Sequence, residues 1–233
     1  HRRAQGRGKK GGPAVTRPPR IALFGGTFDP IHSGHLRSAA VVGRRFGLDR
    51  ILFVPSNIPP HKARRDMAPA RDRMAMVELA LRGRPRFAAS PIEIRAGGTS
   101  YSIRTLRRLR RLHPRARIFF IVGTDAFLEI KTWKEWRSVL DESLFIVMTR
   151  PGVGLAKARR APGAEYADRV RPVGRTERVR EDWFSASRIF LFPIDALDVS
   201  ATEIRGRIRE GRPLAGLVSA AVARYIRARK LYL

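Results

Sequence analysis

Residues 21–35 constrain the fold more than any other stretch of this chain. Residues 21–24 form a short apolar run, which is typical of a strand buried in a parallel sheet. Gly25 and Gly26 follow at once, and without Cβ atoms they would let a phosphate group approach the backbone N–H groups of the turn. The stretch therefore predicts a strand followed by an anion-binding turn.

A helix is expected directly after this turn. Pro30 disfavours a helix start at Asp29, whereas Ser33 or Gly34 could cap a helix that runs through residues 36–46. The N-terminus of such a helix attracts anions. His32 and His35 are three residues apart, so both imidazoles would share one face at that end. Turn, helix end and imidazoles together indicate a site for nucleotide phosphates.

Two plainer interpretations compete with this one. A Gly-Gly turn after a strand is common and is weak evidence alone. A histidine pair at this spacing could be half of a metal site, but the chain has no cysteine and no third histidine lies nearby. The combination of features is what favours a phosphate site, and no metal held by protein ligands is expected.

The rest of the chain alternates between apolar runs and amphipathic segments, which predicts an α/β protein with a Rossmann-like, doubly wound parallel sheet of about six strands and a C-terminal helical portion. Further strands are expected at residues 51–55, 87–94, 117–122, 144–148 and 189–192, and further helices at 71–81, 101–112, 133–140, 204–210 and 217–226. Ligands of such sheets bind at the carboxyl ends of the strands, and every motif discussed below follows a predicted strand.

The domain organisation follows from composition along the chain. Residues 1–20 are basic, free of acids and rich in Gly and Pro, which predicts a disordered arm. In the folded part, Thr99 or Ser100 is expected to cap the helix at residues 101–112. Residues 21–233 are expected to form a single domain. Within it, residues 151–188 are rich in Pro, Gly and charge and are interpreted as a long surface loop.

The formal net charge of +28 invites a nucleic-acid interpretation. The basic residues are spread along the chain, however, and charge alone supports only nonspecific binding, so no specific nucleic-acid partner is expected. No apolar run reaches the roughly 18 residues of a membrane helix, so no membrane partner is expected. The absence of cysteine suits a reducing compartment, and a cytoplasmic protein is expected. Homo-oligomer formation is left open.

Several motifs together resemble those of the nucleotidylyltransferase superfamily, and more narrowly of the bacterial nicotinate mononucleotide adenylyltransferases. The stretches that carry this resemblance are Gly25 to Pro30 with His32, Gly34 and His35; Pro59-Pro60-His61-Lys62; Ser100-Tyr101-Ser102; Gly123-Thr124-Asp125-Ala126 with Thr132-Trp133; and Ser200 to Arg205. Ser102 stands where the family usually has Thr, which leaves its side-chain contact open.

The resemblance implies transfer of AMP from ATP to nicotinate mononucleotide, which yields deamido-NAD and pyrophosphate in NAD biosynthesis. Two alternatives are a related adenylyl- or cytidylyltransferase with another phosphate acceptor, and a basic nucleic-acid-binding module. Mg²⁺ is expected as a cofactor bound through the ATP phosphates.

By the same resemblance, most of these motifs contain residues with an expected ligand, and His32 and His35 are the expected catalytic residues. The residues expected to bind ATP are Gly25, Gly26, Thr27, Phe28, Asp29, His32, Gly34, His35, Gly123, Asp125, Ser200, Thr202 and Arg205. The residues expected to bind the mononucleotide are Lys62, Tyr101, Ser102, Ile103 and Trp133.

Overall fold

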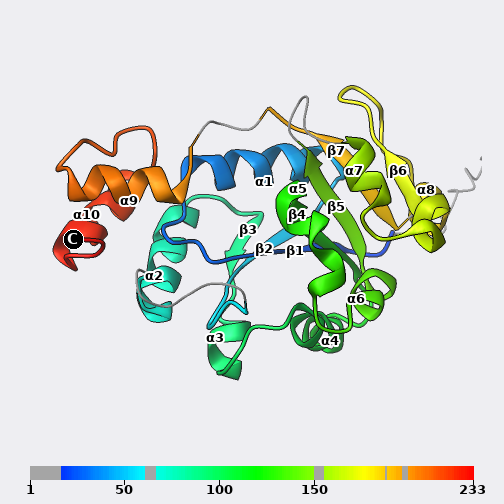
Figure 1. Cartoon of the computed structure of the whole chain (residues 1–233), viewed down its shortest axis with the longest axis horizontal. Helices are drawn as coiled ribbons and strands as arrows, with labels where there is room; N and C mark the ends of the chain where they lie inside the picture. The colour runs from blue at the N-terminus through cyan, green and yellow to red at the C-terminus, as the bar shows by residue number, and fades with distance from the viewer. Residues whose placement is uncertain (1–16, 61–66, 150–154, 187, 196–198) are drawn as a thin grey trace, which may run out of the picture.

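The computed structural model describes residues 17–60, 67–149, 155–186, 188–195 and 199–233, and these form a parallel sheet with helices on both faces (Figure 1). The strands are β1 (Arg20–Gly26), β2 (Arg50–Pro55), β3 (Phe87–Ala89), β4 (Arg117–Gly123), β5 (Leu144–Thr149), β6 (Val170–Pro172) and β7 (Ile189–Pro193). Their order is β3-β2-β1-β4-β5-β7-β6, and every pairing is parallel. This is the Rossmann-like α/β arrangement that the sequence predicts, with seven strands in place of six.

The strands are apolar throughout because both faces of the sheet are covered. Side chains of β1 alternate between two separate cores: Ala22 and Phe24 pack on one face, and Ile21 and Leu23 on the other. The first core is closed by α1 (Ser33–Arg45), α2 (Ala70–Leu81), α8 (Trp183–Ala186), α9 (Ala201–Arg209) and α10 (Ala220–Ala228). The second is closed by α3 (Ile92–Ala96), α4 (Ser102–Leu112), α5 (Thr124–Leu128), α6 (Trp136–Glu142) and α7 (Leu155–Arg160), with the short 3-10 turns η1 (Ile130–Thr132) and η2 (Ala164–Arg169).

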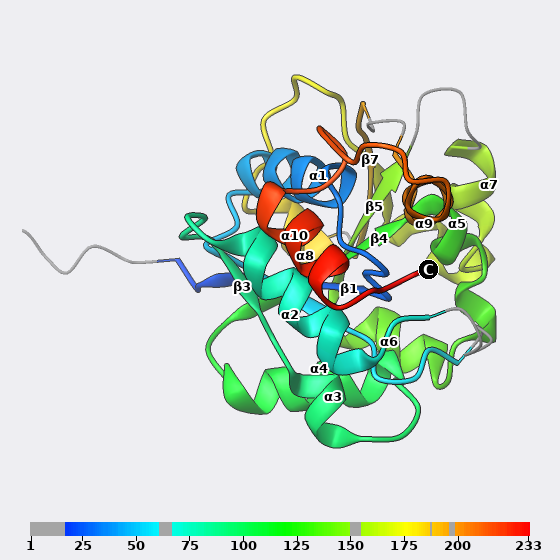
Figure 2. The ribbon, with the colours of Figure 1, turned by 90° about the vertical axis from the view of Figure 1, so that its left-hand side faces the viewer.

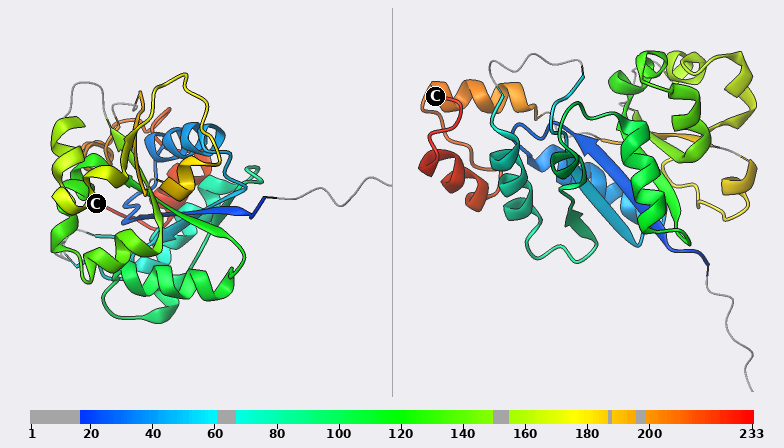
Figure 3. Two further views of the ribbon diagram at one scale, coloured as in Figure 1. Left: turned by 90° about the vertical axis from the view of Figure 1, so that its right-hand side faces the viewer. Right: turned by 90° about the horizontal axis from the view of Figure 1, so that it is seen from below.

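The last two helices lie at one end of the molecule. Figure 2 shows α10 beside α2, and Figure 3 shows α9 and α10 together at the end opposite to α8. This arrangement returns the chain terminus to the region of β1 and α2. Among the described residues, no helix has the length and apolar character needed to cross a membrane.

The segment 151–188 differs from the predicted surface loop. Its described residues include α7, η2, β6 and α8, and the side chains of Tyr166, Val173, Trp183 and Phe184 are buried. The edge strand β6 is three residues long and ends at Pro172, which an edge position tolerates. So short a strand among charged residues gives no periodic signal in the sequence. This explains why the sequence predicts six strands and does not predict β6.

Three predicted helix starts are also wrong. His32, not Ser33 or Gly34, occupies the cap position of α1, and Tyr101, not Thr99 or Ser100, that of α4. The third wrong start is that of α6, which begins at Trp136 and not at Trp133. The α1 start is stabilised by His35, whose side chain accepts from the His32 N–H, and not by the usual Ser or Thr cap. The cap residues Tyr101 and Glu135 form no side-chain cap bond, so the usual capping signals are missing at all three starts.

The third predicted strand, residues 87–94, is only half right. β3 ends at Ala89, and Ile92 and Ile94 belong to α3. Two apolar residues in alternation do not distinguish a strand from one helical turn.

The described part of the predicted basic arm is attached to the domain. Residues 1–16 lie outside the described residues. The Arg17 guanidinium binds both carboxylate oxygens of Asp49, each at 2.8 Å, and Arg20 opens β1 and pairs with Glu181. The folded domain therefore begins before residue 21.

Candidate active site

The candidate site lies where the order of the strands reverses. β1 pairs with both β2 and β4, and the chain leaves β1 and β4 toward opposite sides of the sheet. The two strands end at Gly26 and Gly123, so their following loops open at the same edge. In doubly wound sheets this crevice is the place where ligands bind.

The turn after β1 is shaped by Phe28. Its backbone is left-handed, with φ of 48°, an unusual conformation for an aromatic residue that only a fixed surrounding maintains. The ring is buried edge-on to Phe24, with centroids 5.7 Å apart, and a Cβ on Gly26 would lie 3.2 Å from it. The absence of a Cβ at Gly26 therefore leaves room for the Phe28 ring. A Cβ on Gly25 would meet no heavy atom within 4 Å, so the backbone there borders open space.

The two histidines stack at the start of α1. Their ring centroids are 3.7 Å apart, and the planes are tilted by 31°. The backbone N–H of His32 donates to Nδ1 of His35 at 3.3 Å. A neutral ring whose Nδ1 accepts carries its proton on Nε2, so Nε2 of His35 is a hydrogen-bond donor. Phe28 fixes this ring from the side, at 5.0 Å between centroids.

His32 is buried and neutral. Burial lowers the pKa of His32 to about 4, so the imidazole is uncharged at neutral pH. Its Nδ1 is buried without a hydrogen-bond partner in the described part of the chain. A buried polar atom without a partner is rare in native structures and calls for an explanation such as a ligand or a water molecule.

This burial predicts how stability depends on pH. In the unfolded chain His32 takes up a proton near pH 6.5, whereas the folded protein resists it down to about pH 4. The unfolded state thus binds more protons between these values, and the free energy of unfolding should fall as the pH drops through that window, by up to about 3 kcal/mol. Urea unfolding at pH 7 and pH 4.5 measures the fall, which should be smaller in His32→Gln. An equal fall in both proteins would contradict the burial of a neutral His32.

A second helix N-terminus meets the first one. The Ser200 hydroxyl caps α9 by accepting from the Glu203 N–H at 3.1 Å. A Cβ on Gly34 would lie 3.0 Å from Nδ1 of His32 and 3.6 Å from the carbonyl oxygen of Val199, so α1 and α9 start side by side. Free N–H groups and two helix dipoles therefore converge near the histidine pair, which makes the region favourable for anions.

Arg205 links α9 to the turn after β1. Its Nη1 donates to the Asp29 carbonyl oxygen at 2.8 Å, and its Nη2 donates to the Thr202 hydroxyl at 3.3 Å. The guanidinium thus adds positive charge beside the helix starts and holds the loop. Thr202 itself is exposed in the first turn of α9.

The carboxylate of Asp29 forms hydrogen bonds with other residues of the protein. Its Oδ1 accepts from the Tyr232 hydroxyl at 2.7 Å and from the Ala68 N–H at 3.1 Å, and the residue is buried. The carboxylate of Asp29 therefore holds the loop. Binding of ATP by Asp29 stays a prediction.

Arg73 supports two loops of the candidate site, and the sequence does not predict this. The side chain is fully buried in α2 and donates to three carbonyl oxygens: Nε to Ala68 at 2.9 Å, Nη1 to Thr27 at 2.8 Å and Nη2 to Asn57 at 3.1 Å. Burial lowers the pKa of Arg73, and the charge of Asp29 opposes this. In so basic a chain an arginine on a helix suggests a solvated face. Its spacing from Met76 and Val77 on the apolar face was the signal available.

The residues predicted for the mononucleotide begin beside the same loop. The Asn57 N–H donates to the Ser100 hydroxyl at 2.9 Å, and the Ser100 N–H donates to the Ile58 carbonyl at 2.9 Å. These bonds fix the start of α4, where Tyr101 is the cap residue and Ser102 the first helical one. Ile103 is fully buried in the core, so only its backbone can reach a ligand. Because Arg73 holds both Thr27 and Asn57, this start lies next to the turn after β1.

The remaining predicted residues fall into three situations. Gly123 caps α5, and Asp125 is exposed in its first turn, at the end of β4. Trp133 follows η1 and is half-buried, with its ring 5.7 Å from that of Phe120. Lys62 lies outside the described residues.

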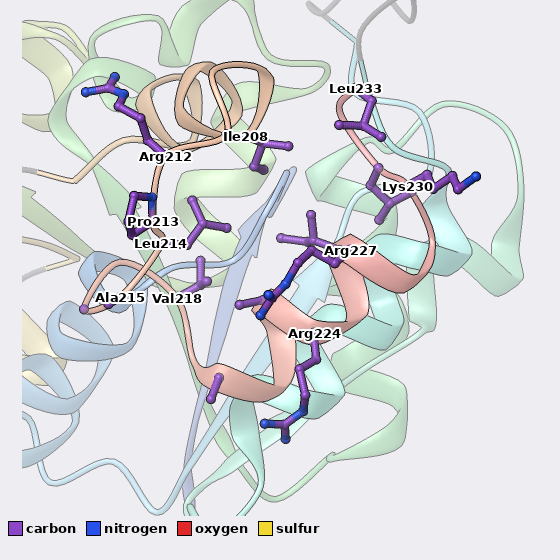
Figure 4. A pocket seen from close by; sticks show the side chains of 16 residues that line it. Ile208, Arg212, Pro213, Leu214, Ala215, Val218, Arg224, Arg227, Lys230 and Leu233 are labelled. Atoms are coloured by element: carbon purple, nitrogen blue, oxygen red, sulfur yellow. The ribbon is translucent and has the colours of Figure 1, made fainter.

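A large cavity of the described residues lies elsewhere. A hollow of about 880 Å³ is formed by α9, α10 and the segment between them (Figure 4). Its wall combines apolar side chains such as Leu214 and Val218 with the basic Arg212, Arg224 and Arg227. It contains none of the predicted site residues, so its size alone does not make it the active site.

Comparison with known proteins identifies the family to which this chain is similar. A family model described as cytidylyltransferase-like matches residues 23–207. A protein of Desulfatibacillum aliphaticivorans named "Probable nicotinate-nucleotide adenylyltransferase" is 42% identical over 218 residues, which cover 92% of this chain and 100% of that protein. A protein of Symbiobacterium thermophilum with the same name is 40% identical over 214 residues, covering 92% and 95%.

Solved structures show the same fold. The nicotinic acid mononucleotide adenylyltransferase of Plasmodium falciparum, complexed with NaAD, superposes with a TM-score of 0.67 over 92% of this chain and 97% of that one. Its sequence identity is 17%, so this likeness concerns the fold.

Proposed function

Because this chain belongs to the nicotinate-nucleotide adenylyltransferase family, within the cytidylyltransferase-like proteins, we propose that it transfers AMP from ATP to nicotinate mononucleotide. The products are deamido-NAD and pyrophosphate, and the reaction is a step of NAD biosynthesis. The observation that carries the proposal is the meeting of the α1 and α9 starts at a stacked histidine pair beside a bare Gly-Gly turn.

The chemistry asks for positioning and charge rather than for a strong base. A phosphate oxygen of the mononucleotide attacks the α-phosphorus of ATP, a new P–O bond forms, and the bond to the β-phosphate oxygen breaks as pyrophosphate leaves. The nucleophile is already an anion, so no proton has to be removed from it. Neutral donors aimed at the phosphate oxygens can stabilise the charge that builds up.

We propose the following division of labour for ATP. His35, with its proton on Nε2, donates to the α-phosphate in the transition state, and His32 and the N–H groups of Gly25 to Thr27 bind beside it. The start of α9, with Ser200, Thr202 and Arg205, binds the β- and γ-phosphates. Gly123 and Asp125 face the ribose or adenine from the end of β4. Phe28 and Gly34 shape the space rather than supply donors.

Mg²⁺ is proposed to enter with the nucleotide. The groups proposed for the phosphates are imidazoles, hydroxyls, backbone N–H groups and the Arg205 guanidinium, which fit phosphate oxygens rather than a magnesium ion. Within the described ranges, no group of three His, Cys, Asp or Glu could hold a metal. Bound to the phosphates, the ion would neutralise charge on the leaving pyrophosphate.

The mononucleotide is proposed to bind between the start of α4 and Trp133. Backbone N–H groups of Ser102 and Ile103 have no helical acceptor within α4 and suit a carboxylate. Cations gather there: Lys134 lies 4.9 Å and Arg104 5.2 Å from the Tyr101 ring centroid. Lys62 would reach the phosphate.

The cellular setting is proposed from composition. The sequence has no cysteine and therefore nothing that requires an oxidising compartment. We propose that the reaction takes place in the cytoplasm, which cell fractionation tests.

One assay tests the proposed function against its alternatives. The protein is incubated with ATP, Mg²⁺ and a panel of phosphate acceptors, and pyrophosphate and new dinucleotides are measured. Formation of deamido-NAD supports the proposal. Product with another acceptor only would favour a related transferase. No product, combined with tight binding of DNA or RNA at physiological salt, would favour the nucleic-acid module.

Selection of the acid over the amide is a separate prediction. We expect kcat/KM for nicotinate mononucleotide to exceed that for nicotinamide mononucleotide by at least about tenfold to a hundredfold. The two rings have nearly the same shape, but an amide would place an NH₂ group against an N–H donor, and a buried donor without a partner costs about 1–3 kcal/mol. Steady-state kinetics with both mononucleotides measures the ratio. Equal values would refute acid selection and leave adenylyl transfer intact.

A further inference from the structure

The last residues of the chain are held in an unusual conformation. After α10 ends, Lys230 and Tyr232 both have left-handed backbones, with φ of 51° and 68°. Such conformations are costly for residues other than glycine and persist where the surroundings impose them. One backbone bond, from the Leu231 N–H to the Ile226 carbonyl at 3.0 Å, folds the segment back on α10. The second fixed point is the Tyr232 side chain.

That side chain ends at the turn after β1. The Tyr232 hydroxyl donates to Oδ1 of Asp29 at 2.7 Å, across 203 positions of sequence. Burial raises the pKa of Tyr232, and the charge of Asp29 raises it further, so the hydroxyl remains a donor at every working pH. Asp29 is buried, which makes a charge-assisted bond to it stronger than one in water.

Asp29 connects the turn after β1 to the histidine pair and to α9. It follows Phe28, whose ring contacts His35, and it comes three residues before His32. Its carbonyl oxygen accepts from Arg205 of α9 at 2.8 Å, and its Oδ1 also accepts from the Ala68 N–H at 3.1 Å. Any shift of Asp29 therefore moves the loop against both helix starts.

We propose that Tyr232 is a positioning residue, which fixes the turn of residues 25–30 and the histidine pair through its bond to Asp29. Tyr232 touches no reacting atom in this proposal. The proposal rests on the proposed function, because its effect is read at the ATP phosphates. Residues 25–30 and the α9 start serve ATP, whereas the start of α4 serves the mononucleotide, so loss of the bond should affect ATP first.

The test is Tyr232→Phe in the full chain, with Tyr225→Phe as the matched control. The Tyr225 hydroxyl also donates to a buried carboxylate, Oδ1 of Asp72 at 2.9 Å, but Asp72 lies in α2 and not in the turn after β1. Both variants remove one hydroxyl at the same end of the molecule and keep the ring. Thermal unfolding of each shows what the lost bond costs the fold alone.

We expect Tyr232→Phe to lower kcat/KM for ATP about tenfold, with KM for the mononucleotide changed less than twofold. Binding of ATP alone, measured by calorimetry, should weaken in parallel, and Tyr225→Phe should keep the parent values in both assays. Equal ATP kinetics in the two variants would overturn the proposal, and so would equal losses for ATP and mononucleotide. If Tyr232→Phe does not fold, Asp29→Asn weakens the same bond and must reproduce the ATP defect; normal ATP kinetics in it would overturn the proposal.

Failure of this proposal is distinguishable from failure of the proposed function. If the parent protein forms no dinucleotide with any acceptor, the function fails, and the calorimetric comparison of ATP binding still decides the role of Tyr232. If the parent forms deamido-NAD and Tyr232→Phe does so with unchanged ATP constants, only the positioning role fails.

Discussion

Replacement of His35 by alanine is expected to lower kcat about 10²–10³-fold, the scale for loss of one donor that acts in the transition state. The reason is geometric. The His32 N–H donates to Nδ1 of His35, which places the proton of His35 on Nε2, and Phe28 and His32 pack against the ring on two sides. A donor held this firmly needs no reorganisation when charge develops on the α-phosphate. Binding of ATP should weaken much less than kcat falls, because other donors surround the phosphates.

Two further variants sharpen this experiment. In His35→Gln the side-chain amide can still donate near the position of Nε2, so part of the lost rate should return. His113→Ala removes a histidine at the end of α4, remote in sequence from the motif, and should keep the parent kcat. Steady-state kinetics of dinucleotide formation compares all three. A near-parent kcat in His35→Ala would assign His35 to structure.

The fold was predictable because its signals are long or repeated. Buried strands such as residues 117–122 are continuous apolar runs, and the helix at 101–112 repeats Ile103, Leu106 and Leu109 on one face. β6 escaped because three residues carry no period, and Ile92 with Ile94 misled because two residues fit either element. Local patterns thus predict elements in proportion to their length.

For the candidate site, the sequence predicts which motif residues lie close together but not which residues support them. His32, His35 and the Gly-Gly turn lie within one short stretch, so their proximity is a local property of the chain. The partners of Asp29, which are Tyr232 and Ala68, lie far away in sequence, and only the folded chain brings them together. The resemblance of the motif assigns Asp29 to ATP, and the sequence gives no sign of these partners.

Loss of the Arg73 guanidinium is the substitution expected to cost the most stability. In Arg73→Met the buried carbonyl oxygen of Ala68 and the half-buried ones of Thr27 and Asn57 lose their donors. The charge of Asp29 also loses its favourable interaction with this guanidinium. We expect the free energy of unfolding to fall by about 3–5 kcal/mol, as for other broken buried charge networks. Arg71→Met removes the same charge from an exposed position of α2, with 78% of the side chain exposed, and should cost less than about 1 kcal/mol.

Urea unfolding of both variants, followed by tryptophan fluorescence, measures these losses. A loss below about 1 kcal/mol in Arg73→Met would mean that water satisfies the three carbonyls, and the guanidinium would then not be the support of the two loops. Arg73→Lys keeps the charge, but lysine lacks the planar guanidinium with which arginine binds the three carbonyl oxygens. Because Thr27 belongs to the proposed ATP side and Asn57 adjoins the mononucleotide side, this milder variant should raise KM for both substrates together. A rise of KM for both substrates would distinguish Arg73 from Tyr232, whose loss should affect ATP first. Arg73 joins the two halves of the proposed site, whereas Tyr232 acts through Asp29 and holds only the ATP half in place.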